Sequence, residues 1–209
     1  MTGAHTELAD AIRSGPVVVQ TETVFGLACL PTAEMVDRVF EAKARPAHLN
    51  LPVIIGDPDQ LAALGIVADD CAEALIEAFW PGALTLAFAV DPHAEGLPWL
   101  DGRDEVAVRI PAVDPLRELA RQVGPFLMTS ANRHGEPPVA SAEEARAVFG
   151  EDTPVFEWPD VDPPGPLPST LVNVGRTPPV IERVGALSVE MIRRVCPSAV
   201  VSGESGSDR

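Results

Sequence analysis

Cysteine is scarce in this chain of 209 residues, and the three cysteines are far apart in the sequence. Cys29, Cys71 and Cys196 form no CxxC pair, and no HxxxH spacing occurs. Disulfide frameworks and structural zinc sites are recognised by closely spaced ligands of these types. We therefore expect neither a disulfide framework nor a metal site built from protein ligands.

The sequence also lacks the patterns of a leader and of a membrane-spanning segment. The first residues include Glu7 and Asp10 and show no basic region followed by an apolar run. The longest apolar stretch, 79–90, contains Pro81 and Gly82 and is shorter than the roughly 20 residues that a membrane helix needs. These absences predict a soluble, cytoplasmic protein without a membrane partner.

Positive charge is in deficit, because 15 lysine and arginine residues stand against 31 acidic ones, which gives a net charge of −16. Such a chain is repelled by anionic membranes and by the phosphates of DNA, which argues against a protein that coats either. Hydrophobic residues make up 46% of the chain, as in globular proteins. The length predicts one domain over residues 6–195, followed by a disordered tail at 197–209.

Lysine is the rarest charged residue, since 14 of the 15 basic residues are arginine and only Lys43 is lysine. A general drift of composition towards arginine explains most of this bias. Such drift replaces lysine wherever a guanidinium serves equally well. The one lysine that remains therefore indicates a point contact that the planar fork of arginine cannot make.

The motifs of common nucleotide-binding and hydrolytic enzymes are absent, since the chain contains no GxxxxGK, GxGxxG, HExxH or GxSxG. Its four histidines are too scattered for a Cys–His or Ser–His–Asp arrangement. If the protein is an enzyme, the sequence favours one that aligns reactive substrates over one that uses a protein nucleophile. No catalytic nucleophile is assigned.

Hydrophobic periodicity predicts an α/β protein in which helices alternate with short strands. Thr32 and Ser141 are expected N-caps, and Glu144 completes a capping box with Ser141. Six prolines between positions 154 and 168 predict a long surface loop without regular structure, and this loop could act as a lid. Short links between several strands favour a mixed sheet. We expect strands at 17–20, 24–29, 51–55, 84–90, 105–110, 126–129, 170–174 and 180–184, and helices at 6–14, 32–43, 69–78, 114–122, 141–149 and 188–195.

Polar residues stand where these expected elements end, which is where α/β sheets bind ligands. They combine four cations with hydroxyl and amide groups, a combination that suits a triphosphate beside a small carboxylate. Each arginine taken alone is more simply explained as a solvated chain end or an ion-pair partner. The residues concerned are Thr21, Thr23, Lys43, Arg45, Arg109, Ser130, Asn132, Ser169 and Arg183.

Seven short blocks, in order along the chain, resemble the YrdC-like family, the threonylcarbamoyl-AMP synthases of tRNA modification. The resemblance covers residues 11–194. One block is weak evidence, but seven in the family's order and at plausible spacing are specific. The blocks are QTETVFGL at 20–27, KARP at 43–46, WPGALT at 80–85, VAVRIP at 106–111, TSAN at 129–132, ST at 169–170 and RVG at 183–185.

The resemblance implies a twisted open α/β sheet of mixed type with flanking helices and a large concave cleft. It further implies that L-threonine, bicarbonate and ATP are joined into threonylcarbamoyl-AMP, with release of pyrophosphate. A downstream threonylcarbamoyl transferase complex would then modify tRNA, which is thus an indirect partner. Mg²⁺ is expected to arrive with ATP.

By motif position, the resemblance implies two groups of binding residues. The group expected to bind threonine and its carboxylated form consists of Thr21, Thr23, Arg109 and Ser169. The group expected to bind ATP consists of Lys43, Arg45, Ser130, Asn132 and Arg183, with Lys43 against phosphate.

The chain departs from the family pattern at four places, which leaves the identity of the amine substrate open. Gln20 replaces proline, Phe25 replaces tyrosine, His134 replaces serine, and the segment 47–51 is about two residues longer. His134 is expected to be an exposed loop residue, with a ligand contact as the alternative. Two other functions stay open: a related carbamoyl-adenylate enzyme with a different amine or carbamoyl donor, and a non-catalytic module that binds double-stranded RNA or is associated with translation. The negative charge and the ten aromatic residues weigh against the RNA-binding module.

Overall fold

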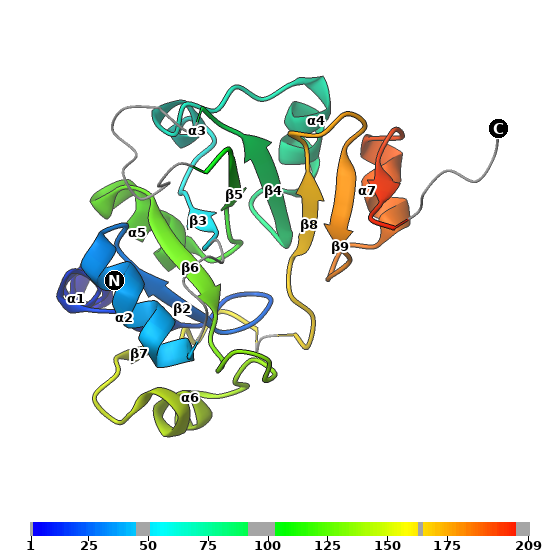
Figure 1. Ribbon diagram of the computed structural model, residues 1–209. Coiled ribbons are helices and arrows are strands. Elements are labelled where there is room, and N and C mark those ends of the chain that lie inside the picture. Colours follow the sequence, from blue (N-terminus) through cyan, green and yellow to red (C-terminus); the bar gives the residue numbers. More distant parts are fainter. Residues whose placement is uncertain (1, 45–50, 92–102, 163–164, 204–209) are drawn as a thin grey trace.

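The computed structural model describes residues 2–44, 51–91, 103–162 and 165–203, and shows a twisted, open ten-stranded sheet with helices on both faces (Figure 1). The sheet order is β10-β9-β8-β4-β5-β3-β6-β2-β1-β7, with parallel and antiparallel neighbours. The expected mixed α/β class is confirmed. The strands are β1 (Val17–Val19), β2 (Gly26–Cys29), β3 (Val53–Ile54), β4 (Leu84–Ala89), β5 (Glu105–Arg109), β6 (Phe126–Ser130), β7 (Val155–Phe156), β8 (Thr170–Asn173), β9 (Val180–Arg183) and β10 (Val200–Val201).

The helices begin at the caps that the sequence predicts. The Thr32 hydroxyl accepts the Met35 N–H at 3.3 Å, and the Ser141 hydroxyl accepts the Glu144 N–H at 3.1 Å. None of the helices in the described residues combines the length and apolar character that a bilayer crossing requires. They are α1 (Thr2–Ser14), α2 (Ala33–Lys43), α3 (Gln60–Ala63), α4 (Asp70–Phe79), α5 (Asp114–Val123), α6 (Ala142–Phe149) and α7 (Val189–Val195).

Side chains alternate between the two faces of the sheet and so build two separate cores. In β3, Val53 belongs to one core and Ile54 to the other; in β6, Leu127 and Met128 are divided in the same way. This alternation is the period-2 geometry of a strand that is buried on both faces. Residues of α2, α3, α4, α6 and α7 complete the first core, and residues of α1 and α5 complete the second.

The second face of the sheet is covered over only part of its width. Among the described residues, the buried members of the second core come from α1, α5, β1, β2, β3 and β6, and from no strand beyond β3 towards β10. On β5, β4 and β9 this face carries polar or small side chains, such as Arg109, Ala107, Thr85 and Glu182, and on β8 it carries Leu171; these side chains line a cavity. The uncovered half of the face therefore becomes the floor of a cleft.

The proline-rich segment contains a strand, which corrects the prediction that it has no regular structure. Val155 and Phe156 form β7 and pair in parallel with Val18 and Val19 of β1. The ladder bonds use groups that proline does not remove: Val18 N–H donates to Pro154 O at 2.8 Å, and Gln20 N–H donates to Phe156 O at 2.9 Å. Two consecutive residues without proline are enough for this short edge strand.

The tail prediction is also wrong in part. Val200 and Val201 form β10, which pairs in parallel with β9. Ala199 is buried, and its carbonyl accepts a hydrogen bond from Arg193 Nε at 3.0 Å. The apolar run 199–201 explains why this part of the segment packs against the sheet. Residues 204–209 lie outside the described residues.

A disulfide joins Cys71 of α4 to Cys196 at the end of α7, a pairing that the sequence, which indicates no disulfide framework, does not predict. The two residues are 125 positions apart in the sequence, yet their Cα atoms are 5.6 Å apart. Sequence spacing could not show this pairing because it depends on α4 packing against α7. The third cysteine, Cys29, is a buried thiol, and burial raises its pKa to about 12.

We expect this arrangement to give a characteristic count of reactive thiols. At pH 8 the folded, unreduced protein should not react with a thiol reagent, because Cys29 is buried and protonated and the other two cysteines are paired. After unfolding in denaturant without reductant, one thiol per chain should react with the reagent; after unfolding and reduction, three should react. In the control Cys29→Ala, unreduced unfolded protein should release none. Three thiols before reduction would show that the disulfide is absent.

Candidate functional site

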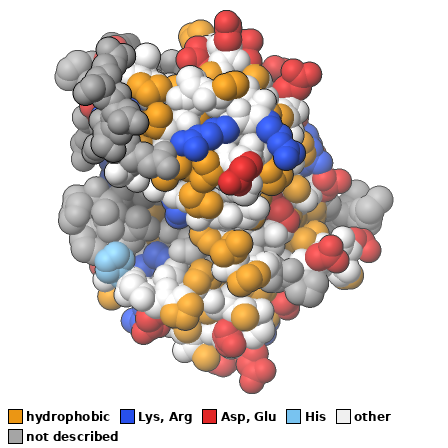
Figure 2. All heavy atoms as spheres, turned by 90° about the vertical axis from the view of Figure 1, so that its right-hand side faces the viewer, with side chains coloured by type: hydrophobic (Ala, Val, Ile, Leu, Met, Phe, Trp, Pro, Cys, Tyr) orange, Lys and Arg blue, Asp and Glu red, His pale blue; other side chains and the backbone are white. Residues whose placement is uncertain are grey.

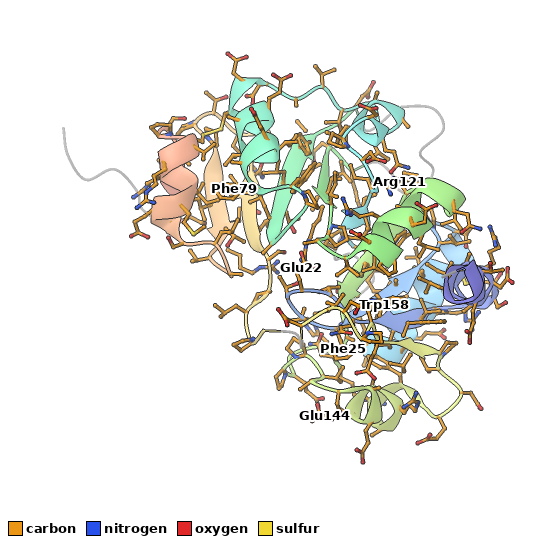
Figure 3. All side chains as sticks on the ribbon, turned by 180° about the vertical axis from the view of Figure 1, so that it is seen from behind. Glu22, Phe25, Phe79, Arg121, Glu144 and Trp158 are labelled. Carbon is orange, nitrogen blue, oxygen red and sulfur yellow. A yellow bond between two sulfur atoms is a disulfide. The ribbon has the colours of Figure 1, made fainter. Side chains whose placement is uncertain are left out.

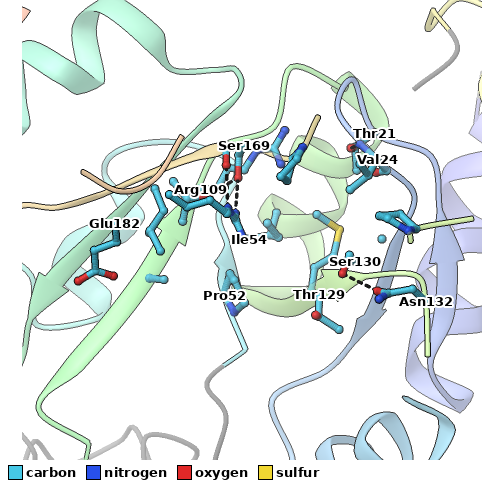
Figure 4. Close-up of a pocket in the computed structure, with 18 of the residues that line it drawn as sticks. Thr21, Val24, Pro52, Ile54, Arg109, Thr129, Ser130, Asn132, Ser169 and Glu182 are labelled. Carbon is cyan, nitrogen blue, oxygen red and sulfur yellow. Dashed lines mark hydrogen bonds between the residues drawn. The ribbon is translucent and has the colours of Figure 1, made fainter. Parts of the chain in front are cut away.

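The cleft contains a cavity of about 610 Å³ on the open half of the sheet (Figure 4). This volume lies within the range of about 300–1,000 Å³ that is typical of small-molecule sites. The cavity brings together residues that are up to 162 positions apart in the chain. Seven of the nine residues expected to bind substrate line it: Thr21, Lys43, Arg109, Ser130, Asn132, Ser169 and Arg183.

The structure describes only one of the other two expected residues. Thr23 is buried but is not among the residues that line the cavity; it lies behind the cavity wall, against Arg109. Arg45 and most of the segment 47–51 lie outside the described residues. His134 is exposed, as expected, and it also lines the cavity.

The turn after β1 is built around the Thr21 hydroxyl. Its oxygen accepts the backbone N–H groups of Thr23 and Val24 at 3.1 and 3.2 Å, and it donates to Val24 O at 2.6 Å. This is the local side-chain-to-backbone bonding by which threonine stabilises a turn. The turn delays the start of β2 to Gly26, two residues later than predicted, and places Thr21 and Val24 at the cavity.

Arg109 closes β5, and its guanidinium is held on three sides. Nε donates to Gly82 O at 3.0 Å, Nη1 donates to Thr23 Oγ1 at 3.0 Å, and Nη2 donates to Glu22 Oε1 at 2.7 Å. The residue is only 5% exposed. Sequence reasoning missed Glu22, although a carboxylate within a mostly buried block, QTETVFG, was a signal that it has a partner.

Ser169 is joined to a second residue that sequence reasoning missed, Thr85. Their hydroxyl oxygens are 2.7 Å apart, because β4 and β8 pair in parallel with Leu84 opposite Thr170. Thr85 interrupts an apolar strand at a position whose side chain faces the cavity, and this interruption was the available signal.

Arg183 reaches Ser169 from the neighbouring strand β9. Its Nε donates to Ser169 O at 3.2 Å and its Nη2 donates to Ser169 Oγ at 3.3 Å. Burial, and then the nearby positive charge of Arg109, lower the pKa of Arg183. An anion bound between the two guanidinium groups would reduce this repulsion, so the geometry favours an anionic ligand here.

Lys43, the last residue of α2, holds the loop that follows β6. Its ammonium Nζ donates to the carbonyl oxygen of Ser130, and to Asn132 O and Asn132 Oδ1 at 2.8 and 2.9 Å. Ser130 Oγ donates to the same Asn132 Oδ1 at 2.6 Å. The expected point contact is therefore present, with the protein's own oxygens as acceptors; whether Lys43 also contacts phosphate stays a prediction.

Acidic side chains line another part of the same cavity, so the cleft is not uniformly cationic. Asn173, which is fully buried, donates through Nδ2 to Glu105 Oε2 at 2.6 Å and to Glu182 Oε1 at 2.8 Å. Both glutamates line the cavity together with the cations. The cavity thus presents acceptors and donors at different places, which suits a ligand with groups of both signs.

Comparison with known proteins identifies the family. The model of the Sua5/YciO/YrdC family, whose description is "Telomere recombination", matches residues 10–185. The chain belongs to the Sua5/YciO/YrdC family.

Individual members of the Sua5/YciO/YrdC family agree with this assignment. A putative threonylcarbamoyl-AMP synthase of Mycobacterium tuberculosis is 35% identical over 191 residues, which cover 88% of this chain and 85% of the relative. The threonylcarbamoyl-AMP synthase of Idiomarina loihiensis is 39% identical over 148 residues, which cover 68% of this chain and 77% of the relative.

Solved structures give the same fold. The crystal structure of Pyrococcus abyssi Sua5 complexed with L-threonine matches with a TM-score of 0.83 and 32% identity, covering 98% of this chain. The match spans only 62% of the length of that Sua5 chain. Escherichia coli YciO, at 19% identity and a TM-score of 0.75, supports the fold alone.

Gln20, one of the departures from the family pattern, attaches the proline-rich segment to the sheet. Its Nε2 donates to Val161 O at 3.2 Å and to Asp162 O at 3.0 Å, and its Oε1 accepts the Trp158 N–H at 2.8 Å. The Trp158 ring N–H also donates to Gln20 O at 3.3 Å (Figure 3 labels Trp158). A proline side chain could make none of these amide bonds.

We expect Gln20→Ala to release this segment. Loss of three side-chain hydrogen bonds should lower the free energy of unfolding by about 1–3 kcal/mol, measured in urea. It should also accelerate proteolysis within 157–168. Gln60→Ala is the matched control, because Gln60 likewise uses its amide to bond two backbone groups, Gly56 N–H and Ala120 O. The control should lose similar stability without faster cleavage at 157–168; equal cleavage in both variants would contradict this role of Gln20.

We expect Lys43→Arg to damage the site although it keeps the charge. The lysine is 2% exposed, so the larger guanidinium cannot enter the space around Ser130 and Asn132 without displacing the loop. The free energy of unfolding should fall by about 1–3 kcal/mol, and ATP binding, followed by calorimetry, should weaken. Unchanged stability and unchanged ATP affinity would show that any cation serves at this position.

Proposed function

We propose that the protein synthesises L-threonylcarbamoyl-AMP from L-threonine, bicarbonate and ATP, with release of pyrophosphate, for the threonylcarbamoyladenosine modification of tRNA. One observation carries the proposal: in a member of this family, one cavity gathers two arginines, a lysine and several hydroxyl groups from segments far apart in the chain. The relatives named as threonylcarbamoyl-AMP synthases support it. On this proposal the enzyme is a nucleotidyltransferase that works in the cytoplasm, ahead of a separate threonylcarbamoyl transferase.

The chemistry needs alignment and charge neutralisation rather than a protein nucleophile. The threonine amine attacks the carbon of carbon dioxide and loses a proton to solvent, or it attacks the carbon of bicarbonate, whose C–O bond then breaks to release water; either route gives an N-carboxylate. An oxygen of this carboxylate then attacks the α-phosphorus of ATP, and the bond from that phosphorus to the bridging oxygen breaks to release pyrophosphate. Holding two reactants at attack distance can replace a large part of the activation entropy, so a rigid cavity is a sufficient catalyst for both steps.

The cavity residues divide the substrates between them in this proposal. Arg109, Thr21 and Ser169 hold the carboxylate and hydroxyl of threonine, with Thr23 acting through Arg109. Lys43, Ser130, Asn132 and Arg183 hold the nucleotide, and Arg45 is assigned to it by motif position alone. Arg183 bonds Ser169 and is close enough to Arg109 for the two charges to interact, which supports a site in which carboxylate and phosphate groups bind side by side.

Magnesium fits the proposal as an ion that travels with ATP. Among the described residues, no group of three or more histidine, cysteine, aspartate or glutamate side chains is placed to hold a metal ion. Mg²⁺ commonly binds through substrate phosphates with few protein ligands. When bound it would neutralise phosphate charge, while the cations of the cavity orient the phosphate chain.

The described part of the face that Figure 2 shows does not favour the alternative of an RNA-binding module. On the face that Figure 2 shows, the described acidic and basic side chains are interspersed rather than gathered by sign. A non-specific RNA-binding surface needs a continuous basic patch, because affinity comes from neutralising phosphates.

The proposal predicts pyrophosphate release that requires both threonine and bicarbonate. The purified protein with Mg-ATP should release pyrophosphate in their presence, and omission of either should reduce the rate to background. Two substitutions test the alternative of a related carbamoyl-adenylate enzyme. Serine or valine in place of threonine tests for a different amine, and carbamoyl phosphate in place of threonine and bicarbonate tests for a different carbamoyl donor. Arg109→Lys should raise the KM for threonine about tenfold or more, since an ammonium cannot make a bidentate carboxylate contact.

Asp57→Asn is the control for this substitution, because it disrupts an exposed pair with Arg121 away from the cavity. It should leave the KM for threonine unchanged. Absence of pyrophosphate with every amine would contradict the proposal.

A further inference from the structure

Glu22, which Figure 3 labels, forms an ion pair with Arg109 but is not among the residues that line the cavity. Its Oε1 accepts from Arg109 Nη2 at 2.7 Å and also from the backbone N–H of Ala112 at 3.0 Å. One carboxylate oxygen therefore joins the turn after β1 to the segment that leaves β5. The pair is largely buried, with side-chain exposures of 21% for Glu22 and 7% for Arg109.

The protein acceptors around Arg109 use only some of its guanidinium N–H groups, and the others are available to a ligand. A guanidinium carries five N–H groups. Within the described part of the chain, Gly82 O, Thr23 Oγ1 and Glu22 Oε1 each take one. Two remain, one on each terminal nitrogen, and two parallel N–H groups are what a bidentate carboxylate contact needs.

The second oxygen of Glu22 argues against a purely stabilising role. Oε2 is buried and has no hydrogen-bond partner among the described residues. A buried carboxylate oxygen without a donor lowers the stability of the folded protein. Groups that lower the stability of the folded protein in this way are typical of functional sites.

We infer that Glu22 is a positioning residue, which turns the Arg109 guanidinium so that its two remaining N–H groups face the carboxylate of the amino-acid substrate. The inference rests on the proposed function, since it concerns the substrate that Arg109 binds. Oε1 supplies the third fixed point of the guanidinium plane, after Gly82 O and Thr23 Oγ1. Without it, the plane can rotate about the Nε and Nη1 contacts, and the two free N–H groups no longer converge on one carboxylate.

The charge of Glu22 and its role as a hydrogen-bond acceptor should affect threonine binding in opposite directions. Variants that change one property at a time can therefore separate the two effects. As a charge, Glu22 competes with the substrate carboxylate for Arg109, so neutralising it should strengthen binding or leave it unchanged. As an acceptor, Glu22 fixes the guanidinium, so removing the oxygen should weaken binding. Glu22→Gln removes the charge and keeps an oxygen of the same reach. Glu22→Asp keeps the charge but is one methylene too short to reach Arg109 and Ala112 together.

The test is calorimetric titration of threonine, and separately of ATP, into the full-length variants. Glu22→Asp and Glu22→Ala should bind threonine about tenfold more weakly or worse, the factor expected for a lost charge-assisted hydrogen bond. Glu22→Gln should stay within about threefold of the parent, and ATP affinity should change by less than about twofold throughout. Threoninol, which lacks the carboxylate, should bind equally to all variants.

Three results would overturn the inference: Glu22→Gln as damaging as Glu22→Ala, Glu22→Ala as good as the parent, or equal losses for threonine and threoninol. If Glu22→Ala does not fold, the contrast between Glu22→Gln and Glu22→Asp still decides. Asp57→Asn, which neutralises another carboxylate bonded to arginine, should bind threonine normally. Failure of the parent protein to bind threonine would instead contradict the proposed function, and it would be seen before any variant is compared.

Discussion

The alternation of side chains along each strand is the constraint on which the cavity depends. The side chains of Val53 and Val108 lie on the face of the sheet that packs into the first core. The side chains of the next residues, Ile54 and Arg109, lie on the other face and line the cavity. A one-residue shift of any strand would exchange these sets. Helices α1 and α5 cover only part of the second face, so the site is a portion of the sheet surface that the fold leaves open. The apolar core on the opposite face keeps this surface rigid.

The cations of this surface are held mainly by uncharged oxygens. Lys43 is bonded to carbonyl and amide oxygens, Arg183 to Ser169, and Arg109 to Gly82 and Thr23, with Glu22 as the acidic partner in these contacts. Carbonyl and hydroxyl oxygens fix the direction of a donor without cancelling its charge. The charges of Lys43, Arg109 and Arg183 therefore stay available to a ligand at their own part of the cavity, although acidic side chains line another part of it.

The sequence predicted the features that are encoded locally. The caps of α2 and α6, most strand positions and seven of the residues that line the cavity follow from periodicity, capping residues and motif blocks. The sheet order did not follow, since β8 beside β4 and β7 beside β1 join strands that are far apart in the chain. The Cys71–Cys196 disulfide and the Glu22–Arg109 pair were missed for the same reason. The strand at Val155–Phe156 was missed because proline content was applied to the whole segment rather than to each residue.

The parallel pairing of β8 with β4 has a consequence for the order in which the molecule is made. During synthesis, β4 and β5 leave the ribosome well before β8 and β9, which supply Ser169 and Arg183 to the cavity wall. Until β8 and β9 dock, β4 presents an unpaired edge and the cavity lacks Arg183. On the proposed function, a nascent chain therefore cannot hold nucleotide in the mature manner until residue 183 has emerged, and until then the unpaired edge of β4 is open to wrong pairing.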